Sequence, residues 1–340
     1  MWTLDDSDSP SASSSSSALA EWGVWVRDGA VAEESADELR AEILGCFEAG
    51  LLQQSGNKLA LKDPSGARTG AALAKRNVFE ADVVAEGAVQ LPELLNRSPR
   101  LRQLLEDERL REALQNPWLK LHRLEQAKIQ VNVGGGGAFP CHFDLPNAAT
   151  ATRVLTVLLY LNPAWQEGDG GEVEVLPLPF AALPLAPLHG RLVAFSSCTS
   201  LHRVRPFSGA QPRVCINFWF EGEATLPFPQ PLTDESYDPR ALRILRILRQ
   251  QPAELRAFCK VWYSDIMVQS LRDTFDPCEE LEAAIALHFE EMAAVKLRIA
   301  GSVLEIFREC LPFSPPASSR KDEDEEAEEA AELGGLFDGL

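Results

Sequence analysis

The chain has 340 residues, of which 45% are hydrophobic and 24% charged, a composition typical of a globular protein with a substantial core. Acidic residues outnumber basic ones by 51 to 32, so the net charge of −19 disfavours general nucleic-acid binding, which depends on clustered lysine and arginine. The seven cysteines are scattered without a C-x-x-C pair, which favours reduced thiols over a disulfide framework.

The N-terminal segment, residues 1–20, is rich in serine and aspartate, and we expect it to be disordered. It lacks the basic start and the apolar stretch of a secretory signal. No run of the chain reaches the ~18 apolar residues of a membrane helix. We therefore expect a cytoplasmic or nuclear protein without a membrane anchor.

The next part of the chain is predicted to contain one strand and two helices. Residues 22–26 form the expected strand, and Ser35 with Glu38 forms a candidate capping box for a helix that ends near Leu51. A second helix is expected over residues 98–114, where leucines recur at helical spacing. Between the two helices lies a polar stretch that contains Gly56, Gly66 and Gly70.

The pattern changes between Leu119 and Phe220. Short runs rich in valine, leucine and isoleucine are separated there by glycine, proline, asparagine and aspartate, with no helical stretch between them. This pattern indicates an antiparallel barrel or sandwich. The runs expected to form strands are 128–133, 154–161, 172–176, 191–195 and 213–220.

After the strands, residues 238–310 return to a helical pattern. The end of the chain carries an unbroken acidic run from Asp322 to Glu326, which is typical of a solvated tail. The predicted organisation is a disordered segment (1–20), a mainly β domain (21–225, its centre at about 120–222), a helical region (231–312) and an acidic disordered tail (313–340).

The motif with the clearest chemistry is His142-Phe143-Asp144. Side chains alternate faces along a strand, so His142 and Asp144 would point the same way, about 6–7 Å apart along the strand, with Phe143 on the opposite face. An imidazole and a carboxylate that converge on one point suit a metal ion.

A third ligand has to come from elsewhere in the chain, and four other histidines are available. His202 is favoured because it lies at the start of a predicted strand, whereas His122 precedes the barrel, His189 lies in a loop and His288 lies in the helical region. Two histidines and one carboxylate form the facial triad of non-haem iron oxygenases. Such a triad leaves three octahedral positions open, of which a bidentate keto acid can take two and dioxygen the third.

Arg213 opens the last predicted strand, and the period of two places Asn217 and Trp219 on the same face. A buried guanidinium needs an anion, and its planar fork suits a carboxylate. The distal carboxylate of a metal-bound keto acid would be that partner. Tyr160, which shares a strand face with Thr156, needs a partner for its hydroxyl, and the same carboxylate could provide it. Thr156, Asn217 and Trp219 are candidates for lining this pocket.

These residues resemble the iron(II)- and 2-oxoglutarate-dependent dioxygenase superfamily, and most closely its prolyl-4-hydroxylase-like branch, over about residues 120–222. The H-x-D motif, the distal His202 and the basic Arg213 follow in the order of that branch. Its Tyr-Leu-Asn strand end corresponds to residues 160–162, and its acidic-Gly-Gly turn to residues 169–171.

The resemblance implies a double-stranded β-helix, or jelly roll. It implies that 2-oxoglutarate is decarboxylated to succinate and CO2 while dioxygen hydroxylates a substrate C–H bond. Iron(II) would be held by His142, Asp144 and His202, and 2-oxoglutarate by Arg213 and Tyr160. L-Ascorbate is a further cofactor that the resemblance suggests, and no catalytic residue is predicted beyond the metal site.

The branch often has tyrosines nine and three residues before the first histidine, where this chain has Val133 and Phe139. Three hypotheses follow for the function. The first is a hydroxylase acting on a prolyl residue of a protein or peptide. The second is the same chemistry on a small metabolite or another side chain. The third is a non-catalytic metal-binding interaction scaffold, against which the intact triad and Arg213 argue.

Overall fold

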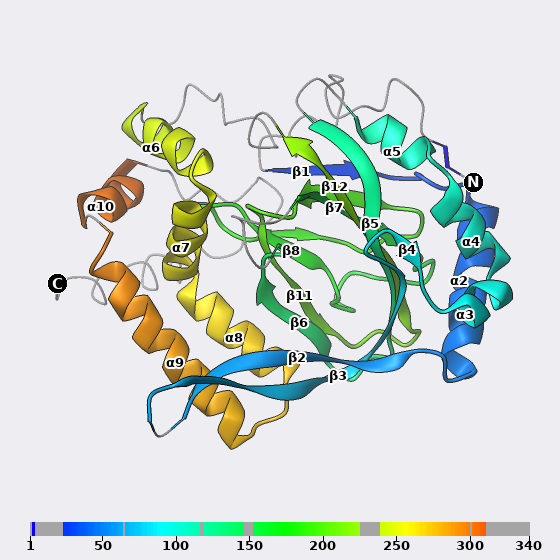
Figure 1. Ribbon diagram of the computed structural model, residues 1–340, viewed down its shortest axis with the longest axis horizontal. Coiled ribbons are helices and arrows are strands. Elements are labelled where there is room, and N and C mark those ends of the chain that lie inside the picture. Colours follow the sequence, from blue (N-terminus) through cyan, green and yellow to red (C-terminus); the bar gives the residue numbers. More distant parts are fainter. Residues whose placement is uncertain are drawn as a thin grey trace.

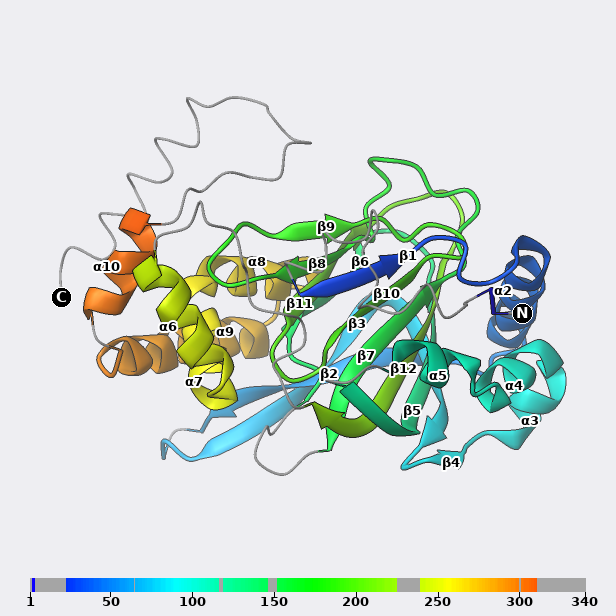
Figure 2. The same ribbon diagram turned by 90° about the horizontal axis from the view of Figure 1, so that it is seen from above.

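The computed structural model describes residues 2–3, 23–63, 65–115, 119–145, 152–224, 239–299 and 301–310 (Figure 1). The predicted acidic tail, and all but two residues of the predicted N-terminal segment, lie outside this range. Two antiparallel sheets face each other, with helices packed on either side (Figures 1 and 2). The predicted fold class, a mainly β jelly-roll core with flanking helices, is confirmed.

Within the described residues, the larger sheet has eight strands and the smaller has four. The order in the larger sheet is β1-β10-β7-β12-β5-β3-β2, with β4 paired to β3, and the order in the smaller is β6-β11-β8-β9. The larger sheet contains β1 (Val24–Arg27), β2 (Gln53–Lys62), β3 (Arg68–Ala85), β4 (Ala88–Val89), β5 (Leu119–Asn132), β7 (Arg153–Tyr160), β10 (Leu192–Ser196) and β12 (Arg213–Ala224). The smaller contains β6 (Gly137–His142), β8 (Val173–Leu176), β9 (Leu183–Leu185) and β11 (Leu201–Phe207).

Strand β12 separates an outer core from an inner one, as its period of two predicts. Val214, Ile216 and Phe218 belong to a large apolar cluster on the outer face of the larger sheet. Cys215, on the opposite face, belongs to a second cluster that also includes Tyr160 and residues of the smaller sheet. The side chains that alternate with the outer core therefore lie between the two sheets.

Helices of the N-terminal half cover the outer face of the larger sheet and supply leucines to the outer core. The helix predicted to begin at Ser35 begins at Glu33, and no side chain caps it. The helix predicted over residues 98–114 is broken at Asp107, whose carboxylate accepts a hydrogen bond from the Arg109 backbone N–H at 3.1 Å and competes with helical bonding. The helices are α2 (Glu33–Glu48), α3 (Pro92–Arg97), α4 (Pro99–Glu106) and α5 (Arg109–Leu114).

The polar stretch around Gly56, Gly66 and Gly70 forms the long hairpin β2–β3, which sequence reasoning missed. Most of its side chains toward the hairpin tip are exposed or half-buried, so the usual alternation of apolar and polar residues is absent. The tip is closed by Asp63, whose carboxylate accepts hydrogen bonds from the backbone N–H groups of Ser65 and Ala67.

The predicted helical region consists, in its described part, of α6 (Pro239–Arg249), α7 (Pro252–Trp262), α8 (Ser264–Thr274), α9 (Glu279–Lys296) and α10 (Gly301–Cys310). Leu245, Phe258 and Phe307 from these helices share an apolar cluster with Phe143 and Leu201 of the β core. Helix α9 packs on the β2–β3 hairpin, where Lys62 pairs with Glu290 and Arg68 with Glu291. The helices thus back the smaller sheet and the hairpin (Figure 2).

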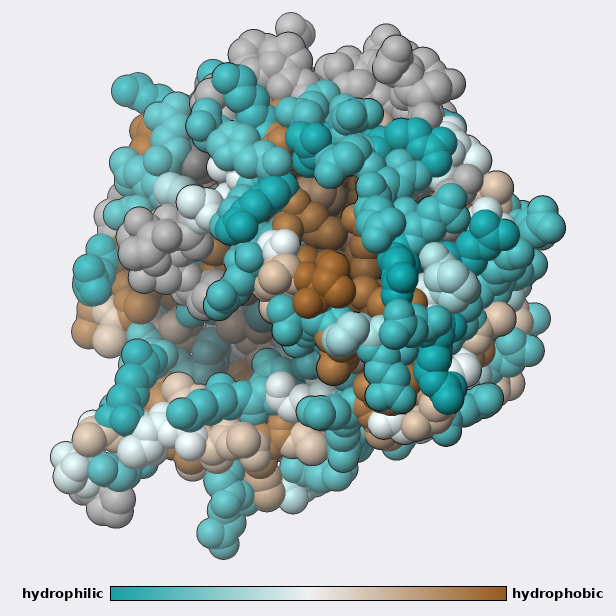
Figure 3. All heavy atoms as spheres, turned by 45° about the vertical axis from the view of Figure 1, so that its right-hand side comes forward, coloured by the Kyte–Doolittle hydropathy of each residue, from teal (hydrophilic) through white to brown (hydrophobic). Residues whose placement is uncertain are grey.

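Hydrophilic residues dominate the face of the molecule shown in Figure 3, and its hydrophobic residues gather mainly in a central hollow. None of the helices in the described ranges is both long enough and apolar enough to span a bilayer.

Candidate metal centre

His142 and His202 face each other across two neighbouring strands of the smaller sheet. They form a register pair between β6 and β11, and their ring centres are 4.3 Å apart. Phe195 of the larger sheet packs on His202, with ring centres 4.6 Å apart. The register therefore brings together two histidines that are 60 positions apart in the sequence.

Asp144 completes the group from a bend rather than from a strand. The sequence placed His142 and Asp144 on one strand, but β6 ends at His142. The Asp144 Oδ1 atom lies 3.3 Å from His142 Nε2, and Oδ2 lies 3.7 Å from His202 Nε2. The three ligand atoms lie within 4.8 Å of one another, and this is the group of potential metal ligands found among the described residues. Arg153 steadies the bend by donating to the Asp144 carbonyl at 3.1 Å.

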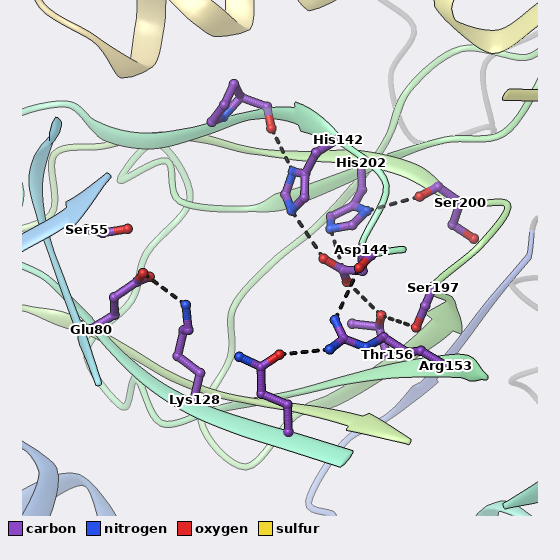
Figure 4. A network of polar contacts seen from close by, with 12 residues as sticks. Ser55, Glu80, Lys128, His142, Asp144, Arg153, Thr156, Ser197, Ser200 and His202 are labelled. Atoms are coloured by element: carbon purple, nitrogen blue, oxygen red, sulfur yellow. Dashed lines mark hydrogen bonds and ion pairs between the residues drawn. The ribbon is translucent and has the colours of Figure 1, made fainter. Parts of the chain in front are cut away.

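Both imidazoles present the same nitrogen to the centre (Figure 4). His142 Nδ1 donates to the Pro140 carbonyl at 2.8 Å, and His202 Nδ1 donates to the Ser200 carbonyl at 3.1 Å. With the proton on Nδ1, each Nε2 lone pair faces Asp144. This tautomer is the one that binds a metal through Nε2.

The charge states of the buried residues also suit a cation. Burial and the nearby His142 lower the pKa of His202 to about 4, which keeps its imidazole neutral near pH 7. Burial alone would raise the pKa of Asp144, but His202, His142 and the Thr156 hydroxyl hold it well below its usual range. The site therefore offers an ionised carboxylate beside a neutral imidazole, a donor set that fits a divalent transition metal.

Thr156 lies directly against the carboxylate. Its hydroxyl donates to Asp144 Oδ2 at 2.6 Å, and it lies 2.7 Å from the Ser197 hydroxyl (Figure 4). Thr156 is fully buried on β7. The sequence predicted a pocket-lining residue here, and the structure places it in contact with the carboxylate of the triad.

Farther along the interior lie Arg213 and Tyr160, both buried. Arg213 Nε donates to the Gly171 carbonyl at 2.8 Å, and among the described residues no carboxylate lies within ion-pair distance of this guanidinium. The Tyr160 hydroxyl has no hydrogen-bond partner there either. Burial raises the pKa of Tyr160 well above its ordinary value, so the hydroxyl remains a donor. A buried cation and a buried hydroxyl without an acceptor fit a carboxylate ligand.

The glycines of the Asp-Gly-Gly turn have a steric role next to Arg213. Gly171 has a φ of +76°, and a Cβ at this position would lie 2.8 Å from Arg213 Cδ. A Cβ at Gly170 would lie 1.9 Å from the Pro206 carbonyl oxygen. Glycine at position 171 therefore lets the backbone approach Arg213 and accept its hydrogen bond, and glycine at position 170 lets the turn pass close to the Pro206 carbonyl.

The two remaining pocket candidates lie on the inner face of β12. Asn217 is buried, and its Oδ1 accepts a weak bond from the Cys215 thiol at 3.1 Å. Trp219 pairs in register with Thr156, and its indole N–H has no acceptor in the described part of the chain. The Arg153 guanidinium carbon lies 5.1 Å from the centre of the Trp219 ring system. Trp219 therefore lies near the candidate metal ligands. Asn217, two residues earlier on the same face of β12, lies nearer to Arg213.

Sequence reasoning missed a polar wall on β3 and β5. Lys128 pairs with Glu80 at 2.9 Å, and Gln126 accepts from Arg153 at 2.8 Å (Figure 4). The sequence does contain a pattern that indicates this wall, because Gln126, Lys128 and Gln130 alternate with apolar residues that belong to the outer core. That alternation would have shown which face of β5 points into the interior.

The other three histidines have separate partners. His122 lies 3.7 Å from Glu223, His189 lies 3.1 Å from Asp37, and His288 lies 3.0 Å from the Ser264 hydroxyl. None of these three belongs to the group formed by His142, Asp144 and His202.

Helix α8 supports both strands that carry the histidines. The Cys141 backbone N–H donates to the Ser270 hydroxyl at 2.9 Å, and Arg203 lies 3.5 Å from the Asp273 carboxylate. Burial raises the pKa of the Cys141 thiol to about 11, so this neighbour of His142 is an inert, packed thiol near pH 7. The C-terminal helices therefore back the candidate centre directly.

Comparison with known proteins identifies the family. Residues 127–221, which contain the triad, Tyr160 and Arg213, match the model of the 2OG-Fe(II) oxygenase superfamily. This part of the chain is therefore an oxygenase domain of that superfamily, whose members are dioxygenases, a class of oxidoreductases. The sequence matches none of the curated proteins.

Solved structures similar to the oxygenase include prolyl 4-hydroxylases. A prolyl 4-hydroxylase structure from Phytophthora capsici is 26% identical, with a TM-score of 0.62 over 86% of this chain and 88% of that one. This likeness extends well beyond residues 127–221. A prolyl-4-hydroxylase from Pseudomonas putida is 20% identical, with a TM-score of 0.45 over 60% and 95% of the two chains. A prolyl hydroxylase from Trichoplax adhaerens, solved with a hypoxia inducible factor peptide fragment, is 21% identical, with a TM-score of 0.43 over 60% and 86%.

Proposed function

We propose that this oxygenase binds iron(II) through His142, Asp144 and His202, binds 2-oxoglutarate through Arg213 and Tyr160, and hydroxylates a substrate C–H bond. One observation carries the proposal: a single interior holds both a carboxylate between two imidazoles and a buried guanidinium without a carboxylate partner among the described residues. A metal site alone would not need the second feature.

Iron(II) fits the donor set because two imidazoles and one carboxylate are the ligands of the facial triad. A structural zinc site would more often be closed by a fourth protein ligand, and the described residues offer none within this group. The role of Thr156 is to hold the Asp144 carboxylate in orientation through its hydroxyl. The Pro140 and Ser200 carbonyls orient the two imidazoles in the same way.

The length of 2-oxoglutarate suits the interval between the triad and Arg213. Thr156, which contacts Asp144, and Tyr160 are four residues apart on β7, or about 13 Å along the strand. A five-carbon dicarboxylate, together with the reach of the Arg213 side chain, can bridge this interval. Its distal carboxylate would accept from the Arg213 guanidinium and from the Tyr160 hydroxyl, which supplies the two acceptors that these residues lack.

When bound, iron and 2-oxoglutarate supply the oxidising chemistry: one atom of O2 enters the substrate as a hydroxyl group, the other enters succinate, and CO2 is released. The chain contributes position and shielding. Phe195 and the strand pairing fix His202, and the two sheets keep Arg213 and Tyr160 out of water. L-Ascorbate stays a prediction, to be tested by whether it prolongs turnover.

For the substrate, we propose a prolyl residue of a protein or peptide. The support is the likeness to the Phytophthora capsici prolyl 4-hydroxylase, which covers most of both chains. The test is mass spectrometry of proline-containing peptides after incubation with iron(II), 2-oxoglutarate and air. A gain of one oxygen on proline is expected. Succinate formation without any oxidised peptide would contradict the prolyl assignment.

A second candidate substrate, a polar metabolite or a different side chain, is favoured by one observation. The interior wall on β3 and β5 carries the Lys128–Glu80 ion pair, and each of these two side chains is 18% exposed. A prolyl ring is apolar and has no groups that complement this pair, whereas a polar substrate has them. Exchanging this pair for Met and Gln should alter the use of such a substrate more than that of a prolyl peptide. Equal effects on both would remove the support.

The central experiment is an anaerobic titration of the intact chain with Fe(II) and then 2-oxoglutarate. A weak visible charge-transfer band is expected when both are bound, together with slow succinate formation on admission of air. His202→Ala should abolish the band, whereas His122→Ala, at an exposed histidine, should retain it. Failure of the unaltered protein to retain iron would refute the proposal. Retention of iron without any succinate formation would favour the non-catalytic metal-binding scaffold.

The compartment that we propose is the cytoplasm or nucleus. The six cysteines whose side chains the structure describes are free thiols, which agrees with a reducing environment.

A further inference from the structure

We propose that Arg40 of helix α2 is a positioning residue for 2-oxoglutarate: it ties together the ends of the two strands that carry Tyr160 and Arg213. This inference rests on the function proposed above. Arg40 belongs to no motif and lies on the outside of the larger sheet, so neither the sequence pattern nor the family resemblance assigns it a role.

Arg40 connects the ends of the two strands through hydrogen bonds to two backbone carbonyls. Its Nη1 donates to the Leu161 carbonyl at 2.7 Å, and its Nη2 donates to the Pro212 carbonyl at 2.7 Å. Leu161 directly follows Tyr160, and Pro212 directly precedes Arg213. One rigid, planar guanidinium therefore spans the backbone next to both proposed 2-oxoglutarate ligands.

These contacts of Arg40 lie at the end of the strand ladder between β7 and β12. The last register pair between β7 and β12 is Tyr160 with Cys215. Beyond it, the Asn162 side chain continues the connection, because its Oδ1 accepts from the Val214 N–H at 2.7 Å and lies 3.4 Å from Arg40 Nη1. Asn162 Nδ2 also donates to the Pro187 carbonyl at 2.8 Å. One further backbone bond lies here, from the Leu161 N–H to the Val214 carbonyl at 3.1 Å. Arg40 and Asn162 reinforce it and so fix the spacing of the two strand ends.

The burial of Arg40 argues that the charge has a purpose. Its side chain is 8% exposed, and it is the charged member of an otherwise apolar buried face of α2 that also includes Leu39 and Ile43. A hydrophobic residue of similar volume at such a position is often neutral for stability or better. Burial lowers the pKa of Arg40, yet a guanidinium stays charged near neutral pH.

The location of this charge suits an anion. Arg40 and Arg213 line one small pocket together with Asn162, Gln211 and Asp169. The two guanidiniums outnumber the one carboxylate of this lining, so Arg40 makes the local potential more positive, and low-dielectric surroundings strengthen its effect on a bound anion. Arg40 therefore contributes both strand spacing and positive potential at the end of the interior where the distal carboxylate would bind.

The experiment is anaerobic titration of the Fe(II)-loaded intact chain with 2-oxoglutarate, read by the charge-transfer band, for the unaltered protein, Arg40→Met, Arg40→Lys and Arg111→Met. Arg111 is a matched control, because it donates from covering helix α5 to a carbonyl of β5, that of Leu121, away from Tyr160 and Arg213. We expect Arg40→Met to weaken 2-oxoglutarate binding by about tenfold or more, as is common for residues that orient a ligand set. The 2-oxoglutarate affinity of Arg40→Lys should lie between those of Arg40→Met and the unaltered protein. Arg111→Met should bind 2-oxoglutarate as tightly as the unaltered protein.

Iron affinity, measured separately, should be unchanged in all three variants, which distinguishes positioning of 2-oxoglutarate from general loosening of the fold. Equal 2-oxoglutarate affinity in Arg40→Met, or a parallel loss of iron and 2-oxoglutarate, would overturn the inference. If Arg40→Met does not fold, Arg40→Lys decides: an unchanged affinity overturns the inference, and a selective loss supports it. Absence of the band in the unaltered protein would instead overturn the proposed function, and this inference with it.

Discussion

The guanidinium carbon of Arg213 lies 5.1 Å from the centre of the Tyr160 ring. Both side chains are buried, and the tyrosine is fully so. In the described chain, Arg213 has a backbone carbonyl but no carboxylate as partner, and the Tyr160 hydroxyl has no acceptor. An arrangement of this kind stabilises a bound anion at the expense of the ligand-free protein, because it buries polar groups that only the ligand satisfies.

This relationship predicts opposite effects of Tyr160→Phe on stability and on binding. Removing a buried hydroxyl without a partner should leave the free energy of unfolding unchanged or raise it by up to about 2 kcal/mol. The same change should weaken 2-oxoglutarate binding by about tenfold. Urea denaturation and anaerobic titration measure the two quantities. A destabilised variant with unaltered 2-oxoglutarate affinity would contradict the assignment of Tyr160.

Thr156 offers a test of the metal centre that leaves all three ligands in place. Thr156→Val keeps the shape but removes the hydroxyl that donates to Asp144 Oδ2 at 2.6 Å. Iron affinity should fall by about 10- to 100-fold. Thr156→Ser retains the hydroxyl and serves as the control. The measurement is the iron that stays bound after desalting against a chelator, and equal retention in the two variants would count against the role of Thr156.

Lys75 predicts a pH dependence of stability. It is 4% exposed, donates to the Ser55 hydroxyl at 2.8 Å and lies 4.1 Å from the Phe139 ring centre. Burial, partly offset by Glu80, lowers its pKa from 10.5 to about 8. Between these two values the unfolded chain holds a proton that the folded chain has released, so the contribution of Lys75 to stability rises with pH, by up to about 1.4 kcal/mol per pH unit.

Lys75→Met isolates this effect. Below about pH 8 both folded and unfolded lysine are charged, so the buried charge is least favourable there and the Met variant should have its largest relative advantage. That advantage should shrink as the pH rises from about 8 toward 10.5. Denaturation of both proteins at pH 7, 8 and 9 gives the difference, and a difference independent of pH would refute the prediction.

Ser270 predicts how strongly helix α8 supports the strand that ends in His142. Ser270→Ala removes the acceptor of the Cys141 N–H, a buried backbone donor, and should lower the free energy of unfolding by about 1–3 kcal/mol. Ser65→Ala, in the exposed tip of the β2–β3 hairpin, should change it by less than about 0.5 kcal/mol. Similar losses in the two variants would show that α8 does not provide this support.

The grouping of His142, Asp144 and His202 and the burial of Arg213 could be predicted because their chemistry is local and rare. The chain has only five histidines, and one of them forms an H-x-D motif. The alternation on the last strand separated Arg213 from Val214 and Ile216 without any knowledge of the fold, and the separate inner and outer clusters bear it out. Periodicity is dependable where one face of a strand is core and the other is not.

Other features depend on partners distant in sequence and could not be predicted. Arg40 looks like any polar residue of an amphipathic helix until its acceptors, 121 and 172 positions away, are known. The β2–β3 hairpin has mainly polar, exposed strands near its tip, so it lacks the periodic signal. Asp144 reaches the site from a bend because Arg153 and Thr156 hold it there, which no strand pattern encodes.

Helix α8 begins more than forty residues after the family match ends, yet Ser270 and Asp273 contact the strands that carry both histidines. A protein shortened at residue 221 would lose the helix that supports the proposed metal centre and would expose Phe143 and Leu201 to water. Inherited differences in iron affinity among close relatives should therefore be sought in the segment 264–274 as well as in the ligands themselves.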